Sequence, residues 1–308
     1  MGSKWRPLPP PHRGFFANPL RERRARRLLD EDWARLLASA DLISRRPSVS
    51  GLFVSLTSHA ARFRTLALTL KSLLVQTVRP EAILLWIGDR DLPALPAEVR
   101  ALEAFGLSIR ACQDHGPHTK YVHALREFPQ ARVAICDDDI YYRPAWLAEL
   151  VAAERPGEVP CHRIHRIVLD GQGLPERYAL WQHESRLRDA SPLDFPTGVG
   201  GALLRAEQFD RRLFDMGLAR ELCPSSDDLW LYATARLAGT RFRLAGSCDP
   251  LITWRRSQRV TLWWTNVAGR ANDRNMAASI AHFGAERLFG RPAMPALAGW
   301  RLSRGTAA

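Results

Sequence analysis

The chain has 308 residues, of which 46% are hydrophobic and 25% are charged, an ordinary composition for a soluble globular protein of one large or two small domains. No apolar stretch approaches the roughly 18–20 residues of a membrane-spanning helix, which excludes such a span. Five widely spaced cysteines without a C-x-x-C pair, and no signal-peptide pattern, predict a cytoplasmic protein. The net charge of +12 is unusual and favours anionic partners such as nucleotides, lipid headgroups or nucleic acid.

The first fifty residues differ in composition from the remainder. Residues 1–46 hold eleven Lys/Arg and five Asp/Glu, which gives +6, half of the excess charge. A proline-rich arm ends near residue 19, and the spacing of Leu29, Trp33 and Leu36 then predicts a basic amphipathic helix. We expect this helix to pack on the following domain. Peripheral contact with an anionic inner membrane face through residues 20–43 is the alternative.

From Gly51 onward, buried strands alternate with helices. The apolar runs predict strands at 52–56, 82–87, 107–112 and 133–136, with helices at 63–76, 98–105 and 120–127 between them. Such βαβ units predict an α/β fold with a mostly parallel sheet flanked by helices. Residues 51–285 are expected to form this domain and 286–308 a C-terminal tail.

The second half of the domain is less regular. We expect a helix at 145–154, a strand at 159–169, a helix from Asp227 to Gly239 and a strand at 241–245. Glycines 198, 200 and 201 permit close approach to a ligand, or a tight turn into the strand that follows them. No G-x-G-x-x-G follows the first strand, so the dinucleotide-binding fingerprint is absent, and the lack of a G-x-x-x-x-G-K-[ST] loop excludes a P-loop nucleotide hydrolase.

Three consecutive carboxylates, Asp137, Asp138 and Asp139, follow the strand that ends at Cys136. Because unpaired carboxylates are costly to bury, they are expected at the carboxyl edge of the sheet, where open α/β sheets bind ligands. Carboxylates gathered at such an edge suit Mg²⁺ or Mn²⁺ with phosphate oxygens in its shell. A solvated acidic turn before the helix that follows Pro144 is the competing interpretation.

A second acidic pair, Asp227 and Asp228, opens a predicted helix about ninety residues later. Ser225, three residues before Asp228, fits a capping box, which would make these carboxylates purely structural. An Asp that faces the cleft could instead act as a general base toward a hydroxyl. The segment from Trp254, rich in Arg and Trp, is interpreted as a lid over an anionic ligand. We expect no nucleic acid in the cleft, because acidic residues line it.

Several segments together resemble bacterial family 2-like glycosyltransferases of the GT-A fold, of the type encoded with capsule and lipopolysaccharide genes. The resemblance rests on segments 55–63, 70–80 and 83–87, on His118-Thr119-Lys120-Tyr121, on the triple Asp, on Gly198-Val199-Gly200-Gly201 and on Asp227-Asp228-Leu229-Trp230. It covers about residues 50–275, and the basic N-terminus lies outside it.

The resemblance implies a set of roles. Asp137 and Asp139 would hold Mn²⁺ or Mg²⁺ on the diphosphate of a UDP- or GDP-sugar, and Asp227 or Asp228 would be the base. The donor would be contacted by Thr57, Ser58, Arg62, Asp89, Lys120, Asp138, Gly200 and Gly201.

The expected activity is inverting transfer of a sugar to a hydroxyl of a glycan or lipid-linked acceptor in surface polysaccharide biosynthesis. Two alternatives stay open: a metal-dependent nucleotidyl- or phosphotransferase, and a non-catalytic basic protein that binds anionic glycan or nucleic acid.

Overall fold

A computed structural model describes residues 19–38, 49–246, 250–255, 257 and 271–290. The proline-rich arm before residue 19, most of the expected lid (258–270) and the tail from residue 291 lie outside the described residues.

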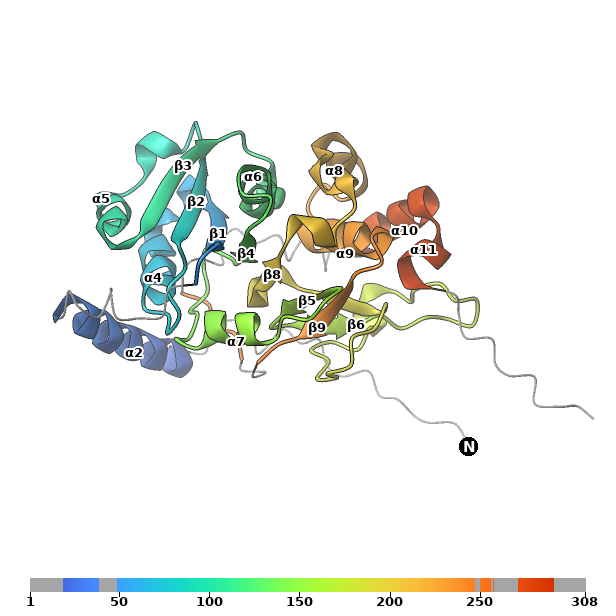
Figure 1. The fold of residues 1–308 in the computed structure, drawn as a ribbon, viewed down its shortest axis with the longest axis horizontal. Coiled ribbons are helices and arrows are strands. Elements are labelled where there is room, and N and C mark those ends of the chain that lie inside the picture. Colours follow the sequence, from blue (N-terminus) through green and yellow to red (C-terminus); the bar gives the residue numbers. More distant parts are fainter. Residues whose placement is uncertain (1–18, 39–48, 247–249, 256, 258–270, 291–308) are drawn as a thin grey trace, which may run out of the picture.

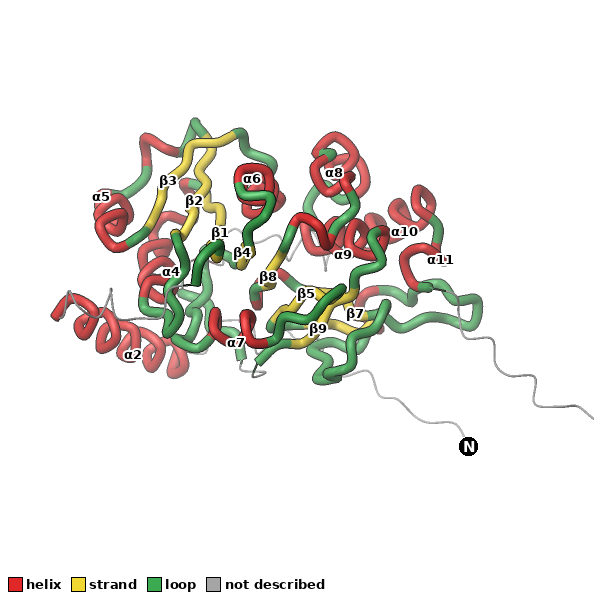
Figure 2. The backbone as a smooth tube through the Cα atoms, viewed as in Figure 1, coloured by secondary structure: helices red, strands yellow, loops and turns green. Residues whose placement is uncertain are grey.

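A seven-stranded sheet in the order β3-β2-β1-β4-β8-β5-β9 forms the centre of the fold (Figures 1 and 2). Its strands are β1 (Leu52–Ser58), β2 (Ala82–Gly88), β3 (Leu107–Cys112), β4 (Arg132–Ile135), β5 (Glu158–Cys161), β8 (Ala202–Leu204) and β9 (Arg241–Leu244). The first four strands are parallel, β8 is antiparallel to β4 and β5, and β5 is parallel to β9. The prediction of an α/β fold with a mostly parallel sheet is therefore confirmed.

Helices cover both faces of this sheet, because side chains of each strand alternate between two hydrophobic cores. Leu52, Val54 and Leu56 of β1 face the core that contains α4 (Phe63–Leu74), α5 (Ala97–Arg100) and α7 (Trp146–Ala152). Phe53 of β1 and Trp86 of β2 face the other core. That second core contains α6 (Thr119–Glu127), α8 (Met216–Leu222), α9 (Asp227–Leu237), α10 (Ala271–Phe283) and α11 (Ala285–Phe289).

Two boundaries differ from the sequence expectation. The strand expected at 159–169 is split: β5 ends at Cys161, and β6 (Ile164–Arg166) leaves the central sheet to pair with β7 (Asp194–Pro196). The backbone N–H of His162 donates to Gly201 O at 3.1 Å, at the point where the chain changes sheets. Helix α11 crosses the boundary predicted at residue 285, and its Leu288 is fully buried in the core beside α9.

The basic amphipathic helix of the N-terminus is present as α2 (Pro19–Ala38), which lies along the outside of the domain near α4 and α7 (Figure 1). Its buried apolar positions are Ala25, Leu29 and Leu36, and the Trp33 ring packs on Phe105 with 5.0 Å between ring centroids. The expectation that this helix packs on the domain is therefore confirmed, and membrane contact stays a prediction.

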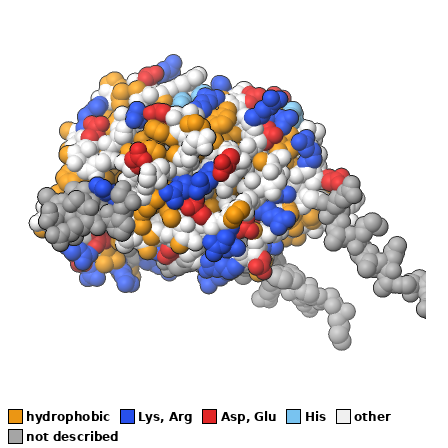
Figure 3. All heavy atoms as spheres, in the orientation of Figure 1, with side chains coloured by type: hydrophobic (Ala, Val, Ile, Leu, Met, Phe, Trp, Pro, Cys, Tyr) orange, Lys and Arg blue, Asp and Glu red, His pale blue; other side chains and the backbone are white. Residues whose placement is uncertain are grey.

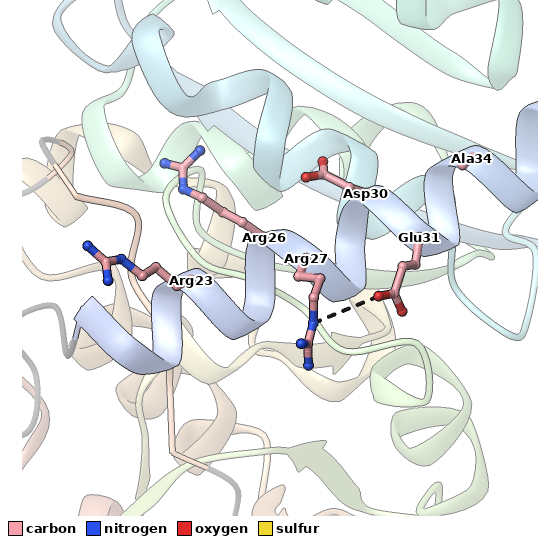
Figure 4. Close-up of a pocket in the computed structure, with 6 residues that line it drawn as sticks. All are labelled: Arg23, Arg26, Arg27, Asp30, Glu31 and Ala34. Atoms are coloured by element: carbon pink, nitrogen blue, oxygen red, sulfur yellow. Dashed lines mark ion pairs between the residues drawn. The ribbon is translucent and has the colours of Figure 1, made fainter.

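The outward side of α2 is strongly charged. An open depression of about 550 Å³ follows it, lined only by residues of this helix (Figure 4): Arg23, Arg26, Arg27, Asp30, Glu31 and Ala34. Arg27 lies 3.8 Å from Glu31, and both side chains are exposed, so this is a solvated surface rather than an enclosed pocket. On the face shown in Figure 3, basic side chains are spread among fewer acidic ones. Among the described helices, none is long and apolar enough to cross a membrane.

Candidate active site

The two acidic clusters meet at the carboxyl edge of the sheet. Asp137, Asp138 and Asp139 follow β4, whose neighbour β1 ends at Ser58. Helix α9 begins at Asp227 and brings the second cluster to the same place. Parallel strands bring the groups that follow them to one edge, so the position expected for the triple Asp agrees with the structure.

The first cluster is held by side chains that follow β1. The Ser58 hydroxyl donates to Asp138 Oδ2 at 2.5 Å, and Arg62 Nη1 donates to Asp138 Oδ1 at 3.1 Å. The same Arg62 nitrogen lies 2.6 Å from Asp139 Oδ2. One half-buried arginine therefore pairs with two adjacent buried carboxylates.

Burial dominates the acid–base behaviour of this cluster. Desolvation raises the pKa of Asp139 to about 7, although the charge of Arg62 opposes the shift. The pKa of Asp138 is also raised by burial, against the effects of Arg62 and Ser58. The pKa of Arg62 is raised, because the nearby carboxylates outweigh its own desolvation. Asp137 differs from its neighbours, with 31% of its side chain exposed.

Lys120 joins the two clusters. Its ammonium lies 2.7 Å from Asp137 Oδ1 and 2.8 Å from Asp227 Oδ2, and only 6% of its side chain is exposed. Burial tends to lower the pKa of Lys120, but Asp137, Asp227 and Asp228 raise it well above the ordinary value. Lys120 is therefore a permanent cation that binds residues 17 and 107 positions away in the sequence.

The backbone of Lys120 is fixed by the sheet. Ser55 of β1 donates its hydroxyl to Lys120 O at 2.5 Å and accepts a hydrogen bond from Trp86 Nε1 at 2.9 Å. The imidazole of His118 contacts Tyr121 Oη at 2.6 Å and Cys223 O at 3.1 Å. These contacts explain why a polar His-Thr-Lys segment starts a buried helix beside the strand ends.

The second cluster does not form the expected capping box. Ser226 is the N-cap of α9 and makes no capping hydrogen bond with its side chain. Asp228 Oδ1 instead accepts from the backbone N–H of Gly198 at 2.6 Å. Burial, with the charge of Asp227, raises the pKa of Asp228 to about 8, although its side chain is partly open to solvent. A partly accessible carboxylate with a raised pKa is suited to accept a proton near neutral pH.

The glycine segment contacts the second cluster through Gly198, and its other glycines have different neighbours. A side chain at Gly198 would lie 2.8 Å from Asp228 Oδ1 and 3.0 Å from Lys120 Nζ. A Cβ at Gly201, where φ is +92°, would lie 2.5 Å from the Trp146 ring, and one at Gly200 would lie 2.9 Å from the Cβ atom of Arg163. Gly200 and Gly201 thus pack against protein, and contact between them and the donor stays a prediction.

Two other predicted donor residues lie at the border of the site. Thr57 Oγ1 donates to Trp86 O of the adjacent strand at 2.9 Å. Asp89 is exposed after β2, and within the described chain no hydrogen bond or ion pair joins it to the clusters. Its neighbour Asp91 accepts a hydrogen bond from the backbone N–H of Ala60 at 3.2 Å, a contact that sequence reasoning missed.

Tyr142 was also missed by sequence reasoning. Its hydroxyl accepts from the N–H of Asp137 at 2.9 Å and donates to Val199 O at 3.1 Å. It therefore connects the triple Asp to the glycine segment. The sequence shows two tyrosines, Tyr141 and Tyr142, shortly after the triple Asp. A pair of tyrosines alone does not indicate which residues it contacts.

A divalent cation fits the site only in part. Among the described residues, no group of three or more His, Cys, Asp or Glu side chains is arranged to hold a metal. Asp138 and Asp139 are already engaged by Arg62, whereas Asp137 keeps an exposed side chain. Of the five carboxylates, Asp137 and Asp227 form ion pairs with Lys120, and Asp138 and Asp139 form ion pairs with Arg62. Because Mg²⁺ is commonly held by one or two carboxylates together with substrate phosphates, Asp137 fits as a ligand, and Asp139 would first have to leave Arg62.

No protein-family model and no curated protein sequence matches the chain. Among solved structures, residues 1–349 of TarS from S. aureus in complex with UDP align at 16% identity, over 77% of this chain and 68% of that one, with a TM-score of 0.45. A second structure of the same TarS segment aligns over 64% of this chain and 58% of its own, with a TM-score of 0.41. In that alignment, the chain spans less than two thirds of its relative.

The 4-diphosphocytidyl-2C-methyl-D-erythritol synthase of Anaerococcus prevotii aligns at 12% identity, over 73% of this chain and 97% of that one, with a TM-score of 0.41. None of these scores reaches 0.5. The assignment of the fold class therefore rests on the strand order and direction described above.

Proposed function

We propose that the chain is a glycosyltransferase that moves a sugar from a nucleotide-sugar donor to an acceptor hydroxyl. The observation that carries this proposal is the Lys120 bridge, because one ammonium group contacts Asp137 at 2.7 Å and Asp227 at 2.8 Å. In this proposal the triple Asp, which would hold the donor diphosphate, and the Asp227–Asp228 pair, which would accept the hydroxyl proton, belong to one site.

The donor lies on the side of the triple Asp in this proposal. Among the described residues, Arg62 and Lys120 are cations that contact the triple Asp, and they would face the negative charge that develops on the departing nucleoside diphosphate. Mg²⁺ or Mn²⁺, bound through Asp137 and the donor phosphates, would supply further neutralisation of that charge. Asp138, held by Ser58, is the neighbour assigned to the ribose or sugar.

Asp228 is the general base in this proposal. It accepts the proton of the acceptor hydroxyl while that oxygen bonds to the anomeric carbon and the bond to the nucleoside diphosphate oxygen breaks. The electron pair of the broken bond leaves with the diphosphate, so atoms and charge balance. One direct displacement inverts the anomeric configuration. Asp227 supports the reaction by holding Lys120.

A product assay tests the proposal. Purified protein is incubated with UDP- and GDP-sugars, with and without Mn²⁺, in the presence of glycan and lipid-linked acceptors. We expect release of nucleoside diphosphate with one donor class. Release of pyrophosphate from a nucleoside triphosphate and a sugar phosphate would instead establish the nucleotidyltransferase alternative. Binding of anionic glycan without release of either product would establish the non-catalytic alternative. An acceptor from surface polysaccharide assembly is the one we propose to test first.

A further inference from the structure

The N-terminal helix α2 carries one buried acid among its solvated arginines. Glu22 is only 4% exposed, although its neighbours Arg21, Arg23 and Arg24 are all exposed. Its Oε1 atom accepts hydrogen bonds from Arg26 Nε at 3.0 Å and Arg26 Nη2 at 2.9 Å. A buried carboxylate requires such partners, and its position on the inner face of α2 directs it toward the domain.

A third contact of Glu22 reaches across the sequence. The same Oε1 atom accepts from the backbone N–H of Arg255 at 3.1 Å, although 233 positions separate the two residues. The adjacent Trp254 is fully buried against Ala25 and Leu29 of α2, and the guanidinium of Arg26 lies 5.3 Å from the centroid of its ring. Helix α2 therefore holds the short segment around Trp254 by a charged hydrogen bond and by apolar packing.

That segment pairs with the backbone that begins at Asp139, the last residue of the triple Asp. The backbone N–H of Trp254 donates to Asp139 O at 3.1 Å, and Thr253 forms an antiparallel bridge with Ile140. The backbone N–H of Tyr141 donates to Ile252 O at 2.9 Å. Ser257, three residues after Trp254, hydrogen-bonds to the Asp139 side chain. The residues that follow the triple Asp are thus paired, like a short strand, with the segment that α2 holds.

The opposite side of Trp254 is fixed to the domain. Its indole Nε1–H donates to Thr69 Oγ1 of α4 at 2.9 Å, and its ring meets Tyr141 edge-on at 5.9 Å between centroids. Trp254 therefore lies between α2, α4 and the backbone of the acidic cluster. A displacement of α2 would be transmitted to Asp139 through the Glu22 contact and the backbone hydrogen bond of Trp254.

From these contacts we infer that Glu22 is a positioning residue for the donor site, and that α2 is part of the catalytic unit and not a separate extension. Glu22 fixes the backbone of Trp254 and Arg255, and this segment in turn fixes Asp139 opposite Arg62. This inference rests on the proposed function, since it assigns the donor to the triple Asp. It adds a residue that lies outside the part of the chain resembling glycosyltransferases.

Kinetics of Glu22 variants test the inference. In Glu22→Ala we expect the donor KM to rise about tenfold with kcat within twofold of wild type, because misplacing a binding group by a fraction of an ångström weakens binding. Glu22→Gln keeps an acceptor for the Arg255 N–H and should recover most of the affinity. Glu31→Ala is the matched control, because Glu31 lies on the exposed side of the same helix, and it should not change KM. An unchanged donor KM in folded Glu22→Ala overturns the inference.

Hydrogen exchange separates failure of the inference from failure of the proposed function. In Glu22→Ala, the amides of Tyr141, Trp254 and Arg255 should exchange at least tenfold faster than in wild type, whether or not a donor has been found. Unchanged exchange at these amides overturns the positioning role. A wild-type protein that releases no nucleoside diphosphate, combined with faster exchange in the variant, would contradict the proposed function alone. If Glu22→Ala does not fold, the same measurements on Arg26→Ala decide the question, since Arg26 holds Glu22 in place.

Discussion

The two acidic clusters of the site have different partners and differ in solvent exposure. Asp138 and Asp139 follow a buried strand, and both are occupied by Arg62. Asp228 opens a helix, bonds to one backbone N–H and remains partly accessible. The difference indicates that the first cluster is built to keep a fixed geometry, whereas the second keeps one carboxylate able to take up a proton. Lys120 connects the two.

Replacement of Lys120 should affect both clusters and should cause the largest loss of stability. Lys120→Met leaves Asp137 and Asp227 without their shared cation, and loss of one partner from a buried ion pair typically costs about 3–5 kcal/mol. Urea unfolding should report a loss of that size. Lys71→Ala is the control: Lys71 lies 5.5 Å from the Trp33 ring centroid at the surface, so about 1 kcal/mol or less is expected. Equal losses in the two variants would show that the Lys120 bridge contributes no more than a surface contact.

The pH dependence of kcat/KM tests whether Asp228 is the general base. Its pKa is raised to about 8 by burial and by Asp227, and a general base acts only when it is ionised. The rate should therefore rise with pH and level off above about 8, with about a hundredfold lower kcat/KM two units below that value. Asp228→Asn should remove this limb. A profile that is flat between pH 6 and 9 would contradict the assignment.

Gly201→Ala should disturb the packing of the glycine segment on Trp146. The added Cβ would lie 2.5 Å from the Trp146 ring at a position with φ of +92°, and overpacking of this kind costs about 1–3 kcal/mol. Gly171→Ala is the control, because a Cβ at Gly171 has no heavy atom within 4 Å. The two thermal unfolding midpoints give the comparison, and an unchanged midpoint in Gly201→Ala would exclude the close contact with Trp146.

Arg62→Ala should weaken the first cluster alone. The loss of one charge-assisted contact is expected to reduce nucleotide affinity about tenfold in the folded variant. Because Asp138 and Asp139 lose their shared cation, the variant should also be less stable than wild type. Titration calorimetry with UDP and GDP measures this effect. Arg64, two residues later and exposed, provides the matched Arg64→Ala control, which should bind like wild type. An equal loss of affinity in both variants would show that general surface charge, not Arg62, binds the nucleotide.

Local patterns in the sequence predict most of the sheet. The run Ile83–Ile87 has no helical spacing and is a buried strand, and the triple Asp follows β4 at the sheet edge, as expected from the cost of burying acids. The insertion of β8 between β4 and β5 was not predictable in the same way. Strand order depends on pairing between distant segments, and Ala202–Leu204 is too short to indicate its partners.

The contacts within the site were harder to predict than its members. Lys120 was expected near the donor, but its bridge to Asp227 depends on how α6 and α9 pack on one face of the sheet. Glu22 is an acid among arginines, a pattern typical of a solvated helix face. It is buried because Trp254 packs on the same helix, a contact between distant parts of the chain that no local pattern predicts.

We propose that one site holds a donor at Asp137 and activates an acceptor at Asp228. Steady-state kinetics of Asp137→Asn and Asp228→Asn, measured by release of nucleoside diphosphate, test it most directly. We expect Asp137→Asn to raise the donor KM, and Asp228→Asn to lower kcat by about 10²–10⁴ with the donor KM unchanged. If Asp228→Asn keeps wild-type kcat, or if Asp137→Asn leaves the donor KM unchanged, the two clusters do not have the roles proposed for them.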